Sequence, residues 1–239
     1  TIFLLIGITF VSFLLTFYSP GDPATMMLKK SGMLVSEETI EIKREELGLN
    51  DSFIEQYFRW MFNMVHGDMG VSYKTNKPVI YELKKTIPPT MILTVAAMLL
   101  TALISIPIGI LCARYKDGVF DNIIRFITYL FASLPSFFLS LIIMYVLSVK
   151  MKLFPIIASA NLKGIVMPVL VLSLTLSSWY IRQIRGMVLS ELNQEYVEGL
   201  RSRGISNKRI LFFHVLKNCM FPILTLMGMS FGILLGGSS

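Results

Sequence analysis

Five runs of the sequence contain no charged residue, and they are residues 1–21, 86–113, 126–149, 164–181 and 218–239. A helix rises about 1.5 Å per residue and the hydrocarbon core of a bilayer is about 30 Å thick, so about 20 apolar residues suffice to cross it. Burying five such runs in a soluble protein would require a much longer chain. The pattern predicts an all-α integral membrane protein, a polytopic helical bundle with spans near residues 1–19, 89–113, 126–149, 164–183 and 219–237.

The segment between the first two predicted spans, residues 20–88, is polar and is expected to fold into helices outside the membrane. Ser36 is placed to cap a helix that Gly48 ends, and acidic residues occupy its first turn. Asp51 can cap a second helix, in which apolar residues recur at helical spacing; they are Phe53, Tyr57, Trp60, Met61 and Met64. We expect this stripe to be a packing face or to lie on the membrane surface.

Prolines occur inside four of the predicted spans, at positions 107, 135, 168 and 222. Each removes a backbone donor and can kink a helix, which membrane proteins tolerate when neighbouring groups satisfy the freed carbonyl. Kinks of this kind fit a moving pathway and static packing equally well.

The net charge of +7 arises in the connections between spans. Residues 20–88 carry nine basic and ten acidic residues, whereas residues 182–218 carry seven and three. The surplus therefore belongs to loops and gives no sign of nucleic-acid binding. Short loops rich in Lys and Arg tend to be cytoplasmic, which places residues 114–125, residues 182–218 and the amino terminus on the cytoplasmic side. Residues 150–163, with three lysines, oppose this assignment.

No charged residue or histidine interrupts the middle of a predicted span. Secondary transporters and proton pumps commonly use such a group as a relay or ion site, so its absence argues against proton-coupled transport. Hydroxyl side chains would then line any pathway, and the candidates are Thr94, Thr101, Ser105, Ser133, Ser136 and Ser177. For each single residue in this set, helix packing is the favoured interpretation, because small hydroxyl residues let helices approach closely.

The sequence carries no motif for ATP hydrolysis or metal binding. It has no G-x-x-x-x-G-K-[ST] loop and no nucleophile elbow, and His66 and His214 are far apart. We expect no catalytic residue, no metal site and no cofactor bound by this chain, so another chain must supply any energy-consuming chemistry. Cys112 and Cys219 lie in or beside apolar runs and are expected to be buried thiols.

A basic, partly amphipathic stretch, residues 184–218, separates the last two predicted spans. MVLSELNQEYVEGLRSR is expected to form one helix that Gly204 ends, and Ser206 is placed to cap a second, NKRILFFHVLKN. Apolar and basic residues alternate in the second helix, and the apolar ones are Ile210, Leu211, Phe213 and Leu216. Such a helix can rest on anionic lipid, to which each basic side chain is attracted by about 1 kcal/mol.

The spacing within this stretch also resembles the cytoplasmic coupling loop of ABC importer permeases, E-A-A-x-x-x-G-x(9)-I-x-L-P. Glu198 and Gly204 hold the positions of the glutamate and the glycine, while Gly199 and the following leucine replace the alanines. His214 and Lys217 stand where Ile and Pro close the pattern. These departures are similar to the loops of peptide and nickel permeases. Other segments resemble that subfamily in the same order, namely SPGDPA, REELGLNDSFIEQYFRW, GDMGVSY, KPV, IPPTMILT and ASLPSFFLSL.

The resemblance covers nearly the whole chain and implies a type I ABC importer permease in the bacterial plasma membrane. Such a permease pairs with a second, similar permease, binds two cytoplasmic ATPases that use ATP and Mg, and receives substrate from an extracytoplasmic solute-binding protein. The loop would dock in an ATPase groove, and the coupling residues implied are Glu198, Gly199, Arg201, Gly204, Ser206, Ile210, Phe213 and His214. Ile210 and Phe213 are the candidates to fill the groove. The substrate would be an oligopeptide, a dipeptide, nickel or a metal chelate.

A self-contained secondary transporter or channel is the alternative function, and a membrane-anchored scaffold is a third hypothesis. The charge-free spans and the spacing from Glu198 to Gly204 favour the ABC permease, whereas a scaffold explains the spans but not the loop. The resemblance further implies six spans where five are expected. Either the chain is truncated or its last part is disordered.

Overall fold

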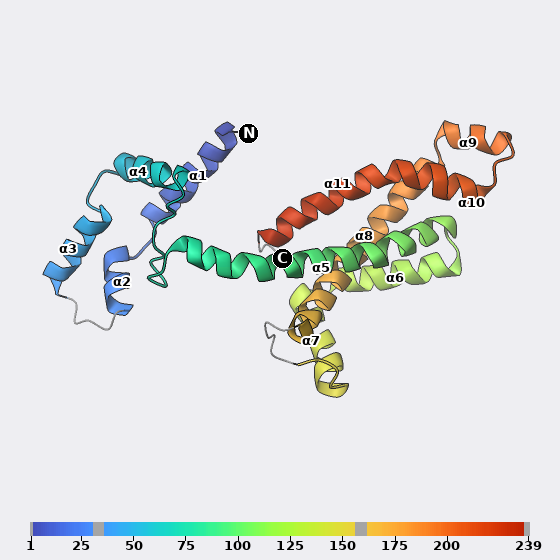
Figure 1. Cartoon of the computed structure of the whole chain (residues 1–239). Helices are drawn as coiled ribbons and strands as arrows, with labels where there is room; N and C mark the ends of the chain where they lie inside the picture. Colours follow the sequence, from blue (N-terminus) through green and yellow to red (C-terminus); the bar gives the residue numbers. More distant parts are fainter. Residues whose placement is uncertain (1, 31–35, 156–161, 237–239) are drawn as a thin grey trace. The chain divides into compact units, whose positions relative to one another are not determined.

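The computed structural model describes residues 2–30, 36–155 and 162–236, and their regular structure is helical apart from one β-bridge between Val71 and Pro78. The all-α class expected from the sequence is confirmed in these ranges (Figure 1). The chain divides into two compact units, residues 1–87 and residues 88–239. The first unit contains α1 (Ile2–Phe17), α2 (Pro23–Lys30), α3 (Glu37–Leu47) and α4 (Phe53–Val65).

The second unit is formed by longer helices. The boundary between the units falls within α5 (Val79–Arg114). The following elements are α6 (Val119–Ser133), α7 (Ser136–Met144), the π-helical turn η1 (Tyr145–Lys150), α8 (Leu162–Leu192), α9 (Glu195–Ser202), α10 (Asn207–Arg209), the π-helical turn η2 (Ile210–Val215) and α11 (Leu216–Leu235).

Three of the described helices are long and apolar enough to cross a membrane, namely Val79–Arg114, Gly164–Leu192 and Asn207–Leu235. Two further helices that meet at a bend, Val119–Ser133 and Ser136–Lys150, are together long and apolar enough to cross a membrane if they are taken as one span. The apolar helix α1 is shorter, with 16 residues. Length and composition thus agree with a multi-pass membrane protein, and helices occupy each region where the sequence predicts a span.

The span predicted over residues 126–149 is not one straight helix. Helices α6 and α7 meet at a bend of 106°. Leu134 has extended backbone angles, φ −90° and ψ 134°, because the ring of Pro135 clashes with a helical conformation of the residue before it. The kink considered at Pro135 is therefore a complete break, and the polypeptide changes direction within the apolar run.

Helices also extend beyond the apolar runs that predicted them. Helix α5 begins ten residues before the predicted start of its span, and α8 ends nine residues after its own. The extensions carry charged residues, among them Glu82 of α5 and Arg185 of α8, so apolar composition marks the embedded part of a helix and not its ends. The last span likewise begins early, since residues 207–235 form one continuous helix.

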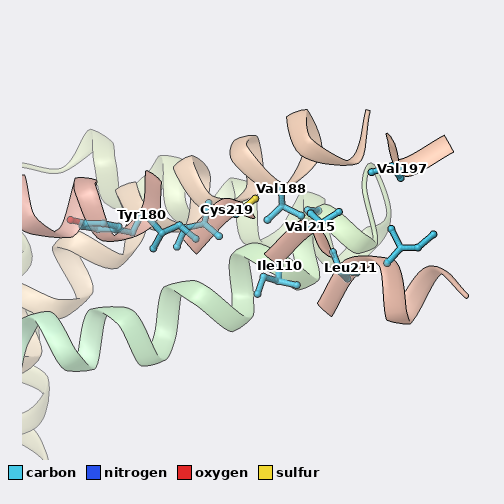
Figure 2. Packing of buried hydrophobic residues seen from close by; sticks show 11 residues of the cluster. Ile110, Tyr180, Val188, Val197, Leu211, Val215 and Cys219 are labelled. Carbon is cyan, nitrogen blue, oxygen red and sulfur yellow. The ribbon is translucent and has the colours of Figure 1, made fainter. Parts of the chain in front are cut away.

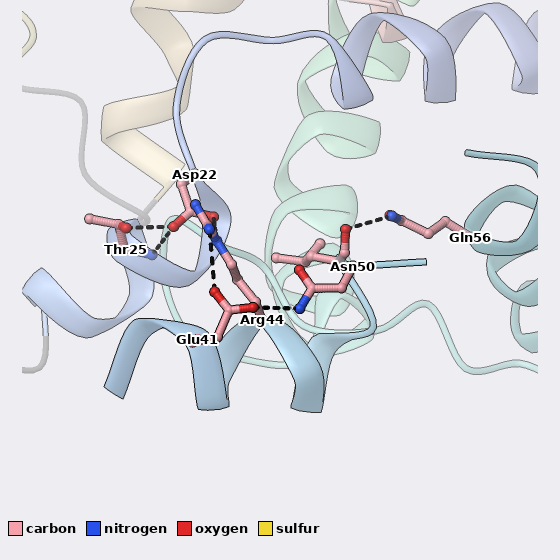
Figure 3. A network of polar contacts seen from close by, with 7 residues as sticks. Asp22, Thr25, Glu41, Arg44, Asn50 and Gln56 are labelled. Atoms are coloured by element: carbon pink, nitrogen blue, oxygen red, sulfur yellow. Dashed lines mark hydrogen bonds and ion pairs between the residues drawn. The ribbon is translucent and has the colours of Figure 1, made fainter. Parts of the chain in front are cut away.

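The first unit is held by two sets of contacts. Aromatic side chains join α1 to α4, and a polar network joins the start of α2 to α3 (Figure 3). In that network the Asp22 carboxylate accepts hydrogen bonds from the hydroxyl of Thr25, at 2.5 Å, and from Arg44 Nε, at 3.3 Å. Gln56 of α4 donates to the carbonyl oxygen of Leu49, at 2.9 Å. The stretch that contains SPGDPA therefore anchors the first unit.

The helix ends in the first unit follow the sequence with one correction. Ser36 caps α3 through the Thr39 amide, and Gly48 ends that helix with a left-handed φ of 64°, as predicted. Ser52, not Asp51, is the N-cap of α4. Its hydroxyl accepts from the Glu55 amide while Glu55 accepts from the Ser52 amide, and this reciprocal capping box outcompetes a cap from the preceding aspartate.

Helix α8 is the centre of the second unit and contacts α6, α7, η2 and α11. Small residues recur every four positions on the face of α5 that meets it, at Ala97, Thr101, Ser105 and Gly109. A Cβ atom added to Gly109 would lie 2.8 Å from Cγ2 of Ile184. Because small side chains let two backbones approach, this small-xxx-small stripe sets the packing of α5 on α8.

A buried ion pair fixes α6 against α8. Arg185 donates from Nε to Oδ1 of Asp121, at 2.7 Å, and from Nη2 to Oδ2, at 2.6 Å. Arg182 donates to the carbonyl oxygen of Thr128, at 2.9 Å. Bidentate pairing of this kind fixes both the distance and the rotation of the two helices.

Candidate functional site

The connecting segment, defined here as residues 193–216, joins the end of α8 to the start of α11. Helix α8 ends at Leu192. Gln194 is the N-cap of α9 and has an extended backbone conformation. This break corrects the prediction of a single helix over residues 187–203. Helix α9 places Val197 in the core cluster, where its side chain has no exposed surface.

The turn between the two halves of the segment is built around Gly204, as the sequence predicts. Gly204 has a φ of 77°, a left-handed conformation that glycine adopts without strain. Its amide donates to the carbonyl of Arg201, at 2.9 Å, and the Ile205 amide donates to the carbonyl of Leu200, at 3.2 Å. Leu200 and Ile205 both pack against the core cluster. These features define a Schellman motif, which ends α9 and redirects the chain.

The inner face of the connecting segment belongs to the hydrophobic core of the second unit. Figure 2 shows Val197, Leu211 and Val215 gathered with Ile110 of α5 and Val188 of α8. The segment is thus fixed to two predicted spans by apolar burial. Because interior packing is dense, a displacement of the segment must be transmitted to the helices that it contacts.

Ile210 belongs to this inner face, which corrects the expectation that it fills a groove in a partner. Its side chain is only 1% exposed and packs in the core cluster. Phe213, the other groove candidate, is 70% exposed. The sequence shows an apolar residue at both positions, and only the packing of η2 separates the inward one from the outward one.

The remaining predicted coupling residues lie on the outer face. Glu198, Gly199, Arg201, Gly204 and Ser206 are exposed, and His214 is half-buried. Ser206 occupies the N-cap position of α10, but its side chain makes no capping hydrogen bond. The connecting segment therefore has an apolar inner face and a polar outer face that carries a large exposed aromatic side chain.

A polar cluster that sequence analysis missed ties α9 to both flanking helices. Glu191 Oε1 accepts hydrogen bonds from the Tyr196 hydroxyl, at 2.8 Å, and from Asn218 Nδ2, at 2.7 Å. Burial, together with the adjacent carboxylate of Glu191, raises the pKa of Tyr196 to about 12, so its phenol remains a donor at neutral pH. The three residues stand on α8, α9 and α11, and no spacing in the sequence marks them as partners.

A basic pocket lies beside the connecting segment. It has a volume of about 310 Å³, and its lining includes Arg114 at the end of α5, Arg201 of α9 and Lys208 of α10. Ala113, Leu192, Asn207 and Leu211 complete the lining. Because both contribute to the lining of this pocket, the end of α5 and the connecting segment lie together at one end of the second unit. A surface with three cations and no acidic group in its lining attracts anionic groups.

The hydroxyl residues considered for a pathway divide into two groups. Thr94, Thr101, Ser105 and Ser177 are buried between helices, whereas Ser133 and Ser136 are exposed at the break between α6 and α7. Thr101 donates to the carbonyl of Ala97, at 2.8 Å, and Ser105 donates to the carbonyl of Thr101. The buried hydroxyls of α5 thus serve helix packing in this conformation.

In the described ranges, no three His, Cys, Asp or Glu side chains are grouped closely enough to hold a metal ion. Cys112 and Cys219 are buried free thiols, as expected from their positions in the sequence.

Comparison with known proteins agrees with this geometry. Residues 105–239 match the family described as "Binding-protein-dependent transport system inner membrane component". The matched residues include the connecting segment. Residues 1–94 match "Binding-prot-dependent transport system membrane comp, N-term". The chain belongs to this family of transport permeases. It is therefore a membrane component of a binding-protein-dependent transport system, a type I ABC permease, as the resemblance implied.

Relatives of this permease include the nickel import system permease proteins NikB of Staphylococcus aureus strains MRSA252 and USA300. Each is 34% identical over 237 residues, which cover 99% of this chain and 71% of the relative. The similarity thus extends through both units. Membership of the family also implies a transport system with several components, of which this permease is one.

Proposed function

We propose that this permease forms part of the translocation pathway of an ATP-driven importer and that its connecting segment docks on a cytoplasmic ATPase. The observation that carries the proposal is the two-faced construction of the segment around Gly204. One face is buried in the core and the other exposes Glu198, Arg201 and Phe213. The ATPase subunits, and not this chain, would use ATP and Mg. A second, similar permease would complete the pathway, and a solute-binding protein would deliver the substrate.

The continuity of the last helix gives this proposal a mechanism. Residues 207–235 form one helix that begins in the connecting segment and continues through the last predicted span. Glu191, Tyr196 and Asn218 also join α9 to α8 and α11 by hydrogen bonds. When an ATPase moves, a segment docked on it would move α8 and α11 with it. This route needs no charged relay inside the membrane.

Charge also supports docking at this end of the second unit. Arg114, Arg201 and Lys208 surround the basic pocket, and the outward Phe213 offers an apolar anchor. An aromatic anchor with surrounding charged groups is a common composition of a binding hot spot. On this proposal the connecting segment and the amino terminus lie in the cytoplasm.

Photo-cross-linking of the assembled transporter tests the docking. A photoreactive phenylalanine analogue is placed at Phe213, and at Phe221 as the matched control, since both side chains are strongly exposed and only Phe213 belongs to the connecting segment. We expect Phe213 to cross-link to an ATPase subunit and Phe221 not to do so. Equal cross-linking from both positions, or none to an ATPase from Phe213, would contradict the proposal.

Nickel, free or within a chelate, is the substrate that the relatives favour, since those named above are nickel import permeases. The described residues contain no group of three potential metal ligands, which suits passage of a metal inside an organic ligand. Cells that carry the complete transporter should accumulate radioactive nickel, and excess dipeptide should not compete. Accumulation of a radioactive dipeptide, with no nickel accumulation, would assign the transporter to peptides.

A further inference from the structure

Helix α4 packs on α1 through aromatic rings. Phe53, Tyr57 and Trp60 meet the rings of Phe10, Phe13 and Phe17, and the centroid distances between rings of the two helices lie between 5.2 and 5.6 Å. The hydroxyl of Thr9 lies 3.2 Å from that of Tyr57. The contacts on α1 extend from Thr9 to Phe17, about 12 Å along the helix at about 1.5 Å per residue. One face of α4 is therefore covered by α1.

A second face of α4 is polar and directed at the turn after α3. Gln56 donates to the carbonyl oxygens of Leu49 and Asp51, at 2.9 and 2.8 Å. Arg59 donates to the carbonyl oxygen of Gly48, at 2.8 Å, and pairs with the Asp51 carboxylate at 2.5 Å. This polar face also carries Asn63 and His66, both exposed.

The third face of α4 is apolar and uncovered. It consists of residues at steps of four, four and three, which fall on one side of a helix; they are Ile54, Phe58, Phe62 and Val65. Their exposed fractions lie between 61% and 77%. Burying a large apolar side chain yields about 1.5 to 3 kcal/mol, so four such side chains favour an apolar environment strongly.

The neighbour of α4 indicates what covers this face. Helix α1 has no charged residue, and its apolar side chains, among them Leu4, Ile8, Val11 and Leu15, are exposed around the helix. A membrane protein covers such a surface with acyl chains. Because α4 packs on α1 between Thr9 and Phe17, a bilayer that surrounds α1 would also border α4. The third face carries no polar side chain that would specify a protein partner.

We propose that α4 is an interfacial helix that lies in the headgroup–acyl boundary of one leaflet, with Ile54, Phe58, Phe62 and Val65 inserted among the lipid chains. Its polar face then meets water and the turn after α3. Interfacial helices combine these features, a wide apolar face and a charged face with water on one side. Helix α4 thereby anchors the first unit to the membrane surface.

Spin-label accessibility in the complete transporter, reconstituted into phospholipid nanodiscs, tests this proposal. Single cysteines are introduced as Phe58→Cys, Phe62→Cys and Asn63→Cys, with Cys112 and Cys219 replaced by serine. Asn63 is the matched control, because it neighbours Phe62 but belongs to the polar face. Oxygen, which concentrates in lipid, and a chromium oxalate complex, which stays in water, serve as relaxation agents.

We expect labels at Phe58 and Phe62 to be relaxed several-fold more by oxygen than by chromium oxalate, and the order to reverse at Asn63. Spectral broadening by lipids that carry a nitroxide near the headgroup should affect only the first two positions. Dominant relaxation by chromium oxalate at Phe58 and Phe62 would show that the face meets water. Low accessibility to both agents there would show that a protein partner covers it, and either result overturns the proposal.

Discussion

Asp121 and Arg185 show how single residues hold the helices of this permease together. The Asp121 side chain has no exposed surface, and the Arg185 side chain, which donates two hydrogen bonds to it, is 17% exposed. Asp117 lies 3.8 Å from the same guanidinium but is 65% exposed. Two aspartates thus face one arginine in very different surroundings.

We expect Asp121→Asn to be strongly destabilising, by about 3–5 kcal/mol, because it leaves a largely buried arginine without its counter-ion. The matched control, Asp117→Asn, should cost less than about 1 kcal/mol, since exposed ion pairs contribute little. Thermal unfolding of the purified permease in detergent measures both. Equal losses in the two variants would show that burial does not decide the strength of this pair.

A second prediction concerns the close contact of α5 with α8. Gly109→Val should destabilise the permease, because a Cβ at this position already lies 3.2 Å from the backbone oxygen of Ile181 as well as close to Ile184. Overpacking of this kind costs about 1–3 kcal/mol. Gly186→Val is the control, since a Cβ there meets nothing within 4 Å. Size-exclusion chromatography after graded heating should separate the two variants, and identical survival would contradict the packing described.

The third prediction is a pH dependence at Asp22. Burial opposes its ionisation, but hydrogen bonds from Thr25 and Arg44 outweigh burial and hold its pKa below the ordinary value of about 3.9. The charged network therefore stabilises the first unit above about pH 4, and this contribution is lost as the pH falls through the lower folded pKa. Hydrogen exchange at the Thr25 amide, corrected for intrinsic rates, should lose protection in that acid range. Asp22→Asn should abolish the step, and an unchanged profile in that variant would refute the assignment.

At the scale of residues, the sequence predicted backbone conformation at helix ends better than it predicted side-chain contacts between elements. Gly48 and Gly204 have the left-handed φ values that their positions after helices suggest. Ile210 and Phe213 could not be told apart, because both are apolar and their directions depend on how η2 packs. The cluster of Glu191, Tyr196 and Asn218 joins three elements, and such pairings depend on tertiary structure alone.

At the scale of elements, the connecting segment depends on one sharp turn. Helix α9 ends in the Schellman motif at Gly204, and α10 starts two residues later. The residues on either side, Leu200 and Ile205, pack against the core cluster and fix the direction of the turn. A change in this turn would therefore redirect the outer face of the connecting segment.

We therefore expect Gly204→Val to uncouple ATP hydrolysis from transport while the permease still inserts and folds. A β-branched residue at a φ of 77° introduces strain of about 1–3 kcal/mol. Gly204→Asn is the matched control, because asparagine tolerates this conformation. Substrate-stimulated ATP hydrolysis by the purified complex should fall in the valine variant and be largely kept in the asparagine variant. Full stimulation with valine would contradict this account of the turn.

The limits of helices were harder to predict than their existence. In the part of the chain that the structure describes, each apolar run overlaps at least one helix, because burial in lipid requires internally bonded backbone. The run over residues 126–149 nevertheless contains a complete break. Hydropathy did not predict this break, because it does not report the backbone restriction before Pro135. The break between α8 and α9 carries neither Pro nor Gly, and tertiary contacts stabilise it, namely the burial of Val197 and the hydrogen bond from Tyr196 to Glu191.

At the scale of the whole molecule, family membership implies a membrane permease that works with other subunits, and the long apolar helices agree with a membrane location. Residues 105–239 match the family and contain α8, the connecting segment and α11. These elements share one core cluster, so a partner bound to the connecting segment would act on the helices of the membrane domain directly. The proposed mechanism needs a partner that hydrolyses ATP, and it excludes transport driven by this chain alone.

Nickel uptake into proteoliposomes tests this claim most directly. The permease is reconstituted with its second permease subunit and both ATPases, the solute-binding protein and nickel are added outside, and ATP with Mg is enclosed. We predict uptake that requires ATP, stops with vanadate and disappears when the ATPases are omitted. Uptake by this permease alone under a proton gradient, insensitive to vanadate, would contradict the account.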